Sequence, residues 1–368
     1  GKGEGGDFPA YFANRCLHFN DFLSAANEEL SALLYRRQLQ SRLRDNRAAV
    51  CRQYAELAGV LGEAAAELSA ELVPDPVREK RLRQHLTAQG IECQLAAYYD
   101  QAGHLRIELE GAGLAPLRKP EAVDRLSKLM NFPLRPLDET RRDQLVLVQS
   151  EPLMAVAGAA AQKKDGQAVS GDTGAWFKHD DGSLYVLLCD GMGSGAPAQR
   201  ESTLAVRLLE QFLRAGVRPE NALRTLNSAL ALRNDEAAGG FTTIDLLRVD
   251  LFTGEAWMYK YGAAPTYVKK GAAVSRITGA ALPAGLTSGD GAAPDTTSLH
   301  LESGDCVLLV TDGVAGGEGD QWIRDKLAAF NGGSPRELAQ AILDESTAQV
   351  GAAADDRTVL ALRLTRRA

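Results

Sequence analysis

The stretch that decides the fold runs Leu184-Tyr185-Val186-Leu187-Leu188-Cys189-Asp190-Gly191-Met192-Gly193-Ser194-Gly195. Its first six residues are all hydrophobic, which predicts a buried strand, and this strand ends abruptly at a carboxylate. Three glycines follow, and they let a ligand or another backbone come close. We therefore expect Asp190 to be held on a rigid scaffold beside an open loop.

A second stretch repeats this arrangement, because the apolar run that starts at Cys306 leads into Thr311-Asp312-Gly313, followed by Gly316 and Gly317. An Asp-Gly pair by itself is a strong hairpin-turn signal. The chain has five such pairs, and the three that lie among polar or small residues are interpreted as turns: Asp165-Gly166, Asp181-Gly182 and Asp290-Gly291. For the two pairs that follow apolar runs, a strand-ending turn competes with a functional interpretation.

Two further acidic sites favour the functional interpretation: Asp172 within Ser170–Gly174, and Asp355-Asp356 just before an apolar run. Four carboxylate sites thus each lie beside a predicted strand. Buried aspartates without a cation would repel one another, and Mg²⁺ and Mn²⁺ prefer oxygen ligands. Zinc is disfavoured, because the five histidines and five cysteines lack paired spacing. Two cations about 3.5 to 4 Å apart would suit in-line hydrolysis of a phosphate ester.

The order of these motifs resembles the type 2C (PPM) serine/threonine protein phosphatases, and within them the stage II sporulation protein E branch. The motifs that carry the resemblance are Gly171-Asp172-Thr173, Asp190-Gly191-Met192-Gly193, Phe241-Thr242-Thr243-Ile244-Asp245, Leu282-Pro283-Ala284-Gly285, Asp312-Gly313 and Asp355-Asp356-Arg357-Thr358. The resemblance covers the chain from about residue 150 to its end. A weaker resemblance to the regulatory segment of the same branch covers roughly residues 20–150.

The resemblance implies a site with two Mn²⁺ or Mg²⁺ ions. Asp190 would bridge both ions, and the carbonyl group of Gly191 would complete the coordination of one of them. Asp312 and Asp355 would hold the other ion. Asp172 would act through a water molecule.

Two parts of the family's site have no clear counterpart in this sequence. Asp356 stands where relatives often carry an amide, so its part in metal binding is open. Relatives outside this branch use an upstream arginine to hold the substrate phosphate, and no equivalent is identified. Substrate recognition is therefore expected in the surfaces around the site.

These observations predict a metal-dependent protein serine/threonine phosphatase that acts on phosphoserine in a protein. Family analogy implies that the substrate is a phosphorylated anti-sigma-factor antagonist, so that the reaction controls sigma-factor activation in sporulation. Two alternatives stay open: a catalytically silent regulatory binding module with the same fold, and a metal phosphodiesterase acting on nucleic acid. The net charge of -7 and the pI near 5.4 disfavour nucleic acid as a partner.

The patterns predict an α+β protein of three parts. Residues 1–75 would form an N-terminal helical linker or coiled-coil segment, residues 76–150 an α/β regulatory domain, and residues 151–368 the phosphatase domain. The phosphatase domain is expected to be a catalytic β-sandwich of two antiparallel sheets flanked by helices. Apolar residues at three-four spacing between Phe19 and Leu72 fit a helix that packs on its own domain, and equally a coiled coil that makes the protein an oligomer.

The predicted elements of the two folded domains follow from the same patterns. Helices are expected at residues 77–88, 121–130, 198–214, 219–233, 321–330 and 335–346. Strands are expected at residues 91–99, 104–110, 145–148, 153–161, 175–179, 184–189, 241–251, 255–259, 266–268, 299–301, 306–311 and 358–364. Helices 198–214 and 219–233 follow directly on the loop after Asp190. We expect them either to control metal occupancy or to serve as fixed cover.

The sequence also bears on where the protein acts. Five scattered cysteines favour a reducing compartment, no apolar run is long enough to span a membrane, and no signal peptide is visible. The chain begins with Gly1 rather than methionine, which favours a fragment of a longer protein. The resemblance implies a preceding membrane-embedded portion, and so the cytoplasmic region of a bacterial inner-membrane protein.

Overall fold

The computed structural model describes residues 72–100, 102–137, 141–234, 240–286, 293–315, 319–350 and 354–367, together with Ser24, Gly59 and Gly62. The chain divides into two compact units, residues 1–61 and 62–368. The predicted long helix over Phe19–Leu72 and its self-association lie almost wholly outside the described residues, as do Gly316 and Gly317. Within the described ranges, no helix is both long and apolar enough to cross a membrane.

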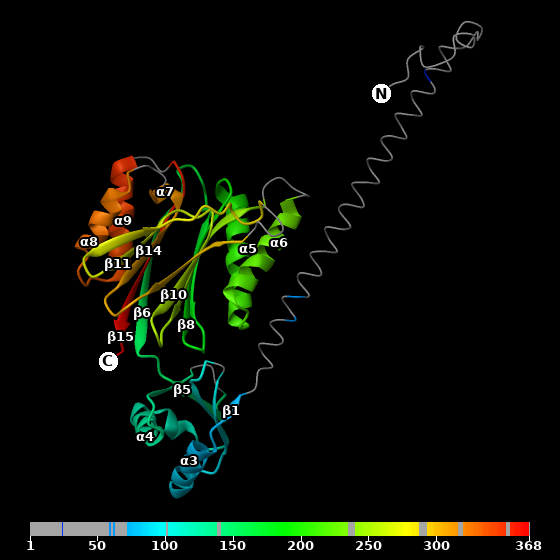
Figure 1. Cartoon of the computed structure of the whole chain (residues 1–368), viewed down its shortest axis with the longest axis vertical. Coiled ribbons are helices and arrows are strands. Elements are labelled where there is room, and N and C mark those ends of the chain that lie inside the picture. The colour runs from blue at the N-terminus through cyan, green and yellow to red at the C-terminus, as the bar shows by residue number, and fades with distance from the viewer. Residues whose placement is uncertain are drawn as a thin grey trace. The chain divides into compact units, whose positions relative to one another are not determined.

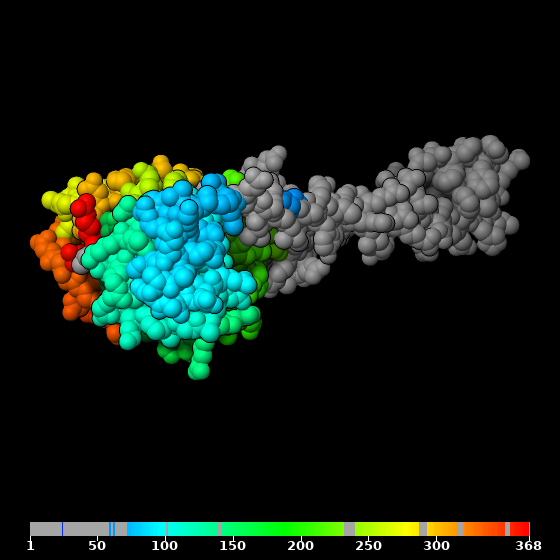
Figure 2. All heavy atoms as spheres, turned by 90° about the horizontal axis from the view of Figure 1, so that it is seen from below, coloured from blue at the N-terminus to red at the C-terminus, as the bar shows by residue number. Residues whose placement is uncertain are grey.

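An α/β domain comes first, built on a five-stranded antiparallel sheet in the order β1-β2-β3-β5-β4. Its elements are β1 (Val73–Pro74), α3 (Pro76–Ala88), β2 (Gln94–Tyr99), β3 (Leu105–Glu110), η2 (Ala115–Arg118), α4 (Pro120–Met130), β4 (Leu134–Pro136) and β5 (Gln144–Gln149). Alternate β3 residues, Leu105, Ile107 and Leu109, pack into the core with leucines of both helices. Figure 2 shows the side chains of this domain, blue to green, as one continuous face.

The C-terminal domain contains two five-stranded sheets, ordered β13-β10-β9-β8-β7 and β12-β11-β14-β15-β6, in which every pair is antiparallel (Figure 1). The first sheet consists of β7 (Asp172–Lys178), β8 (Ser183–Gly191), β9 (Thr242–Asp250), β10 (Glu255–Tyr261) and β13 (Asp295–His300). The second consists of β6 (Leu153–Gln162), β11 (Thr266–Lys270), β12 (Ala273–Ile277), β14 (Cys306–Val310) and β15 (Arg357–Arg366).

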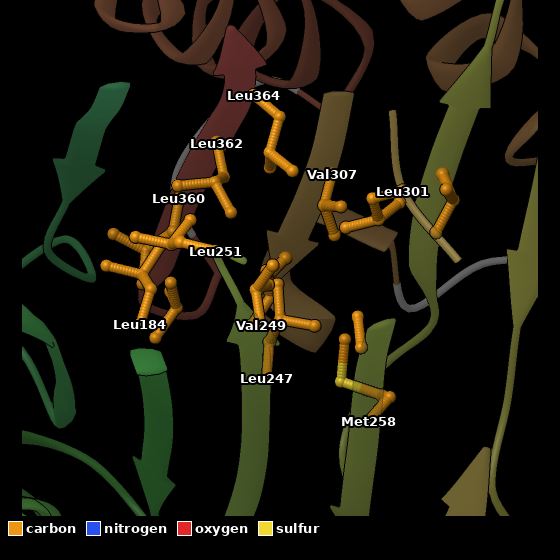
Figure 3. Packing of buried hydrophobic residues seen from close by; sticks show 14 of the residues in the cluster. Leu184, Leu247, Val249, Leu251, Met258, Leu301, Val307, Leu360, Leu362 and Leu364 are labelled. Carbon is orange, nitrogen blue, oxygen red and sulfur yellow. The ribbon is translucent and has the colours of Figure 1, made fainter. Parts of the chain in front are cut away.

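The main hydrophobic core lies between these two sheets. Figure 3 shows Leu360, Leu362 and Leu364 of β15 close to Leu184 of β8 and Val249 of β9. On β8, every second residue from Leu184 onward, namely Leu184, Val186 and Leu188, belongs to this core. The alternate residues Tyr185, Leu187 and Cys189 are also buried, on the opposite face of the strand, which α5 (Gly195–Arg214) covers. Burial on both faces explains why the deciding stretch is hydrophobic without interruption.

Helices cover the outer faces of the sandwich (Figure 1). α5 packs on β7 and β8, and α6 (Pro219–Asn234) packs on α5. α9 (Pro335–Val350) packs on β6 and β15, and α8 (Gln321–Ala329) packs on β11 and β12. A second core of buried residues, among them Leu308 and Ile342, joins these last two helices to their sheet. The predicted sandwich flanked by helices is therefore observed.

One local prediction was wrong, one open alternative is decided by the structure, and three strands were not predicted. β7 begins at Asp172 rather than near residue 175, because its polar first residues pair with the end of β8. Of the two interpretations left open for Asp312-Gly313, the strand-ending turn is not observed, because these residues start α7 (Asp312–Ala315). β1, β4 and β12 carry too few apolar residues to stand out in the sequence, and they form by pairing with stronger strands.

Candidate active site

Two aspartates from each sheet reach the same end of the sandwich. Asp172 opens β7 and lies directly across from Asp190, near the end of β8. Asp312 lies two positions after the end of β14, and Asp355 lies two positions before the start of β15. Because β14 and β15 are antiparallel neighbours, the end of one strand lies beside the start of the other. The structure thus brings together the four aspartates that the sequence singled out.

Asp172 is fixed by a contact that crosses from one sheet to the other. Thr311 Oγ1 donates to Asp172 Oδ2 at 3.0 Å, and the backbone N–H of Thr358 donates to Thr311 Oγ1 at 2.9 Å. The second carboxylate oxygen of Asp172, Oδ1, is buried and has no hydrogen-bond partner within the described residues. An oxygen in this state is suited to a ligand that the protein itself does not supply.

Two adjacent threonines of the Phe241–Asp245 motif hold the backbone of Asp190. The N–H of Asp190 donates to Thr243 Oγ1 at 3.1 Å, and Thr242 Oγ1 donates to the carbonyl oxygen of Asp190 at 2.6 Å. Thr242 also exchanges both backbone hydrogen bonds with Ala284 of the Leu282–Gly285 motif. These two motifs therefore form one support around the end of β8.

The cluster carries an excess of negative charge. Burial raises the pKa of Asp190 far above its ordinary value, and the charges of Asp172, Asp312 and Asp355 raise it further. Burial also raises the pKa of Asp172, with a further contribution from Asp356. The pKa of Asp312 rises because of burial and then the charge of Asp355. Carboxylates that raise each other's pKa in this way are suited to a bound cation.

The glycines of the two Asp-Gly pairs allow close approach of two backbones. A Cβ atom on Gly191 would lie 2.0 Å from the carbonyl oxygen of Ala198 in α5. A Cβ atom on Gly313 would lie 2.0 Å from the carbonyl oxygen of Asp356. Neither glycine has a positive φ, so neither is needed for a turn. Both are needed because a larger residue would push the neighbouring segment away from the aspartates.

Asp356 holds the segment that leads into Asp172. Its side chain is 3% exposed. Oδ1 accepts from the backbone N–H of Lys164 and Oδ2 accepts from that of Gly171, each at 2.8 Å. Both carboxylate oxygens thus have backbone partners, which assigns Asp356 a supporting contact rather than a place among the candidate metal ligands.

The donor set fits divalent cations that prefer oxygen, although the side chains do not form a closed ligand group as they stand. Within the described ranges, no three His, Cys, Asp or Glu side chains are placed so that they could hold a metal ion. The side chain of Asp355 is exposed, and its Oδ1 accepts from the backbone N–H of Asp356 at 2.9 Å, so it is engaged away from a shared ligand group.

Sequence reasoning missed several residues of this site. Thr311 and Thr358 lie within quoted stretches, but nothing in the sequence indicates the hydrogen bond between them. Asn227 of α6 accepts from the backbone N–H of Gly285 at 2.8 Å, and so joins a helix to the Leu282–Gly285 motif. Such contacts join residues far apart in the chain, and no local pattern reveals them.

Comparison with known proteins identifies relatives. The family model described as stage II sporulation protein E (SpoIIE) matches residues 180–365. Stage II sporulation protein E from Bacillus subtilis (strain 168) is 25% identical over 342 residues, which are 89% of this chain and 41% of that protein. The protein of the same name from Priestia megaterium is 26% identical over 367 residues, 95% of this chain and 62% of that protein. This chain therefore spans less than two thirds of the length of these curated relatives.

Solved structures share the fold. The PP2C phosphatase domain with a fragment of the regulatory domain of the cell fate determinant SpoIIE from Bacillus subtilis aligns with a TM-score of 0.66 and 23% identity, over 89% of this chain and 99% of that chain. The RsbU and RsbW domains of Rv1364c from Mycobacterium tuberculosis align with a TM-score of 0.51 and 22% identity, over 59% of this chain and 63% of that chain. The predicted fold and the predicted resemblance are both confirmed.

Proposed function

We propose how catalysis works in this chain, which belongs to the stage II sporulation protein E family of PP2C-type protein serine/threonine phosphatases. The proposed reaction is metal-dependent hydrolysis of phosphoserine in a protein. One observation carries the proposal: Asp172 and Asp190 from one sheet meet Asp312 and Asp355 from the other, with more negative charge than the protein neutralises there.

The proposed cation ligands are the carboxylates of Asp190, Asp312 and Asp355 and the carbonyl oxygen of Gly191, with Asp172 acting through a water molecule. Mn²⁺ or Mg²⁺ suits this all-oxygen set. Two such ions, when bound, supply Lewis acidity to the phosphoryl oxygens and lower the pKa of a water molecule.

The chain's own residues arrange these groups. Thr311 orients Asp172, whose free oxygen Oδ1 is available to a water molecule. Thr242 and Thr243 fix the backbone of Asp190, and so limit where its carboxylate lies. This rigidity matters because a displacement of about 1 Å in a catalytic group is enough to cost two orders of magnitude in rate.

The substrate side of the proposal is a protein. Met192 directly follows Asp190-Gly191, and Leu282 and Leu286 lie two positions on either side of Ala284, which pairs with Thr242. All three side chains are exposed, at 55%, 55% and 45%. Exposed apolar side chains beside a charged site suit a partner that buries them. We propose a phosphorylated anti-sigma-factor antagonist as this partner, by analogy with the sporulation proteins to which the chain is similar.

The N-terminal part has a separate proposed role. We propose self-association through residues 1–75 because their apolar spacing fits a coiled coil. Attachment to the cytoplasmic face of a membrane through a preceding segment is a proposal from family resemblance. We propose that residues 76–150 regulate the phosphatase domain.

The proposed function is tested by phosphate release from a phosphoserine protein with Mn²⁺ in excess. The parent chain should release phosphate, and Asp190→Ala should abolish release, because it removes the ligand that both cations would share. Asp344→Ala, which removes an exposed carboxylate on α9, is the matched control and should leave the rate unchanged.

Three outcomes would count against the proposal. Activity of Asp190→Ala within tenfold of the parent would remove the two-cation assignment. No release by the parent would favour a silent binding module. Faster turnover of a phosphodiester than of the phosphoprotein would favour a phosphodiesterase.

A further inference from the structure

A buried ion pair lies behind the aspartate cluster, and the proposed chemistry does not use it. Asp245 of β9 and Lys260 of β10 are cross-strand partners, and each is 1% exposed. Lys260 Nζ lies 2.7 Å from Asp245 Oδ2. Thr266 of β11, in the other sheet, donates from Oγ1 to the same oxygen at 2.7 Å and accepts from Lys260 Nζ at 2.9 Å. The three side chains form one network between the two sheets.

Stability alone does not explain this pair. Withdrawing two charges from water costs several kcal/mol per ion, roughly, and replacement of a buried pair by apolar residues is often neutral or stabilising. An apolar residue would be the alternative here: Leu188, which pairs with Asp245 across β8 and β9, belongs to the hydrophobic core. A reason for keeping the charges at this position has to come from their surroundings.

The strand register places Asp245 next to the proposed ligands. Thr243 and Asp245 are two positions apart on β9 and therefore share one face of the sheet. Their partners on β8 are Asp190 and Leu188 respectively. Asp245 is therefore one step further along the face that carries Asp190, toward the interior of the sandwich.

A small cavity connects the two groups. Its volume is about 20 Å³. It is lined by Asp190, Asp245, Asp312, Thr243 and Thr311, with apolar groups that include Ala264 and Val310. A space of this size holds about one water molecule, provided that polar partners surround it.

The free oxygen of Asp245 completes the set of partners. Oδ2 is already bound by Lys260 and Thr266, whereas Oδ1 is buried and has no hydrogen-bond partner within the described residues. Lys260 does not line the cavity, so the pair presents its negative end there. Thr243 Oγ1 accepts from the N–H of Asp190, which leaves its own hydrogen to donate.

We propose that Asp245 is a positioning residue for the cation site, acting through one water molecule held in this cavity. The water molecule donates to Asp245 Oδ1 and to the carboxylate of Asp190 or Asp312, and accepts from Thr243 Oγ1. Lys260 holds Asp245 in place for this contact through the buried ion pair. The inference rests on the proposed cation-dependent function, and it assigns to the motif residue Asp245 a role in tuning cation affinity.

The expected size of the effect follows from other metal sites. Hydrogen-bond partners of metal ligands orient them, and loss of such a partner typically lowers metal affinity by roughly 10- to 100-fold. In Asp245→Asn the amide oxygen would keep the contact with Lys260. Its NH₂ group would then face the cavity, where a donor replaces an acceptor and the negative charge is lost.

The test compares Mn²⁺ affinity, measured by titration calorimetry, with stability, measured by urea unfolding. Asp245→Asn should weaken Mn²⁺ binding by about 10- to 100-fold. Thr266→Val is the matched control, because it removes a hydrogen bond to Oδ2 and leaves Oδ1 and the cavity intact. It should lower stability and leave Mn²⁺ affinity within about threefold of the parent.

A second variant approaches the cavity without touching the ion pair. Ala264→Val adds two methyl groups at the cavity wall and should displace the water molecule, so it should also weaken Mn²⁺ binding. This variant decides the matter if Asp245→Asn does not fold.

Each result has a distinct meaning. Unchanged Mn²⁺ affinity in Asp245→Asn and Ala264→Val, or an equal loss in Thr266→Val, would overturn the inference and leave the proposed function standing. Absence of Mn²⁺ binding by the parent chain would overturn both.

Discussion

Asp356 offers a sharp test of how the loop before Asp172 is held. Its two carboxylate oxygens accept the backbone N–H groups of Lys164 and Gly171, each at 2.8 Å. Asp356→Ala leaves both donors without their acceptor. The N–H of Gly171 is buried, so loss of its charged acceptor costs about 1.5–3 kcal/mol, whereas the half-buried N–H of Lys164 recovers water and costs about 0.5–1.5 kcal/mol. The expected loss of unfolding free energy is about 2–4.5 kcal/mol.

Asp356→Asn separates hydrogen bonding from volume, because the amide keeps one acceptor and is nearly isosteric. It should cost about half as much as the alanine variant. Both variants should also weaken Mn²⁺ binding, because the segment they release ends at Asp172. Urea unfolding gives the free energies, and titration calorimetry gives the Mn²⁺ affinity.

Asp344→Ala serves as the control, since this exposed carboxylate accepts an exposed hydrogen bond from Gln340, and it should change stability by about 0.5 kcal/mol or less. The reasoning fails if Asp356→Ala is as stable as this control. It also fails if the asparagine variant is less stable than the alanine variant, because the retained acceptor would then contribute nothing.

Two further predictions concern a glycine and a histidine. Gly313→Ala should lower Mn²⁺ affinity and cost about 1–3 kcal/mol by overpacking against the carbonyl oxygen of Asp356. Gly319→Ala should do neither, because its added Cβ has no neighbour within 4 Å among the residues that the structure describes. Equal effects of the two variants in calorimetry and unfolding would contradict this. His179 Nδ1 lies 3.0 Å from Asp181 Oδ1, and this carboxylate raises the pKa of His179 above its ordinary value of 6.5. Its contribution to stability is therefore complete below pH 6.5 and is lost as the pH rises through the folded-state pKa. The parent should lose urea stability relative to His179→Gln as the pH rises above 6.5, and a constant difference would exclude the effect.

The sequence predicted the strands that are buried on both faces or that alternate cleanly. β8 is the clearest case, because continuous burial produces a continuous hydrophobic run that is easy to read. α7 is the opposite case. The sequence left a turn at Asp312-Gly313 as an alternative and did not predict a helix there. The glycine serves a close approach to Asp356, 43 positions further along the chain by subtraction of residue numbers.

The candidate site divides in the same way. Asp190 and Asp312 were found because each ends an apolar run, which is a local feature. The hydrogen bond from Thr311 to Asp172 joins residues 139 positions apart, and that from Gly171 to Asp356 joins residues 185 positions apart. Asp245 was quoted within a motif, but its partners come from β10 and β11. Only the packing of the two sheets reveals what these residues do.

The sequence left two roles open for the helix after the ligand loop, and the structure offers a contact through which it could act on the site. The first turn of α5 lies against Gly191, where no side chain would fit between the glycine and the carbonyl oxygen of Ala198. A shift of α5 toward β8 would therefore displace the backbone of a proposed cation ligand. We expect a substitution that loosens α5 to weaken Mn²⁺ binding, and an equal disturbance elsewhere to leave it unchanged.

Leu209 in α5 and Leu327 in α8 provide this comparison, because both leucines are 0% exposed and the two helices pack on different sheets. Each Leu→Ala substitution should cost about 2–5 kcal/mol through the cavity it leaves. Leu209→Ala should in addition weaken Mn²⁺ binding in calorimetry, because α5 is the helix that contacts Gly191. If the two variants lose stability alike and bind Mn²⁺ alike, the helix is a fixed cover, and metal occupancy does not depend on its packing.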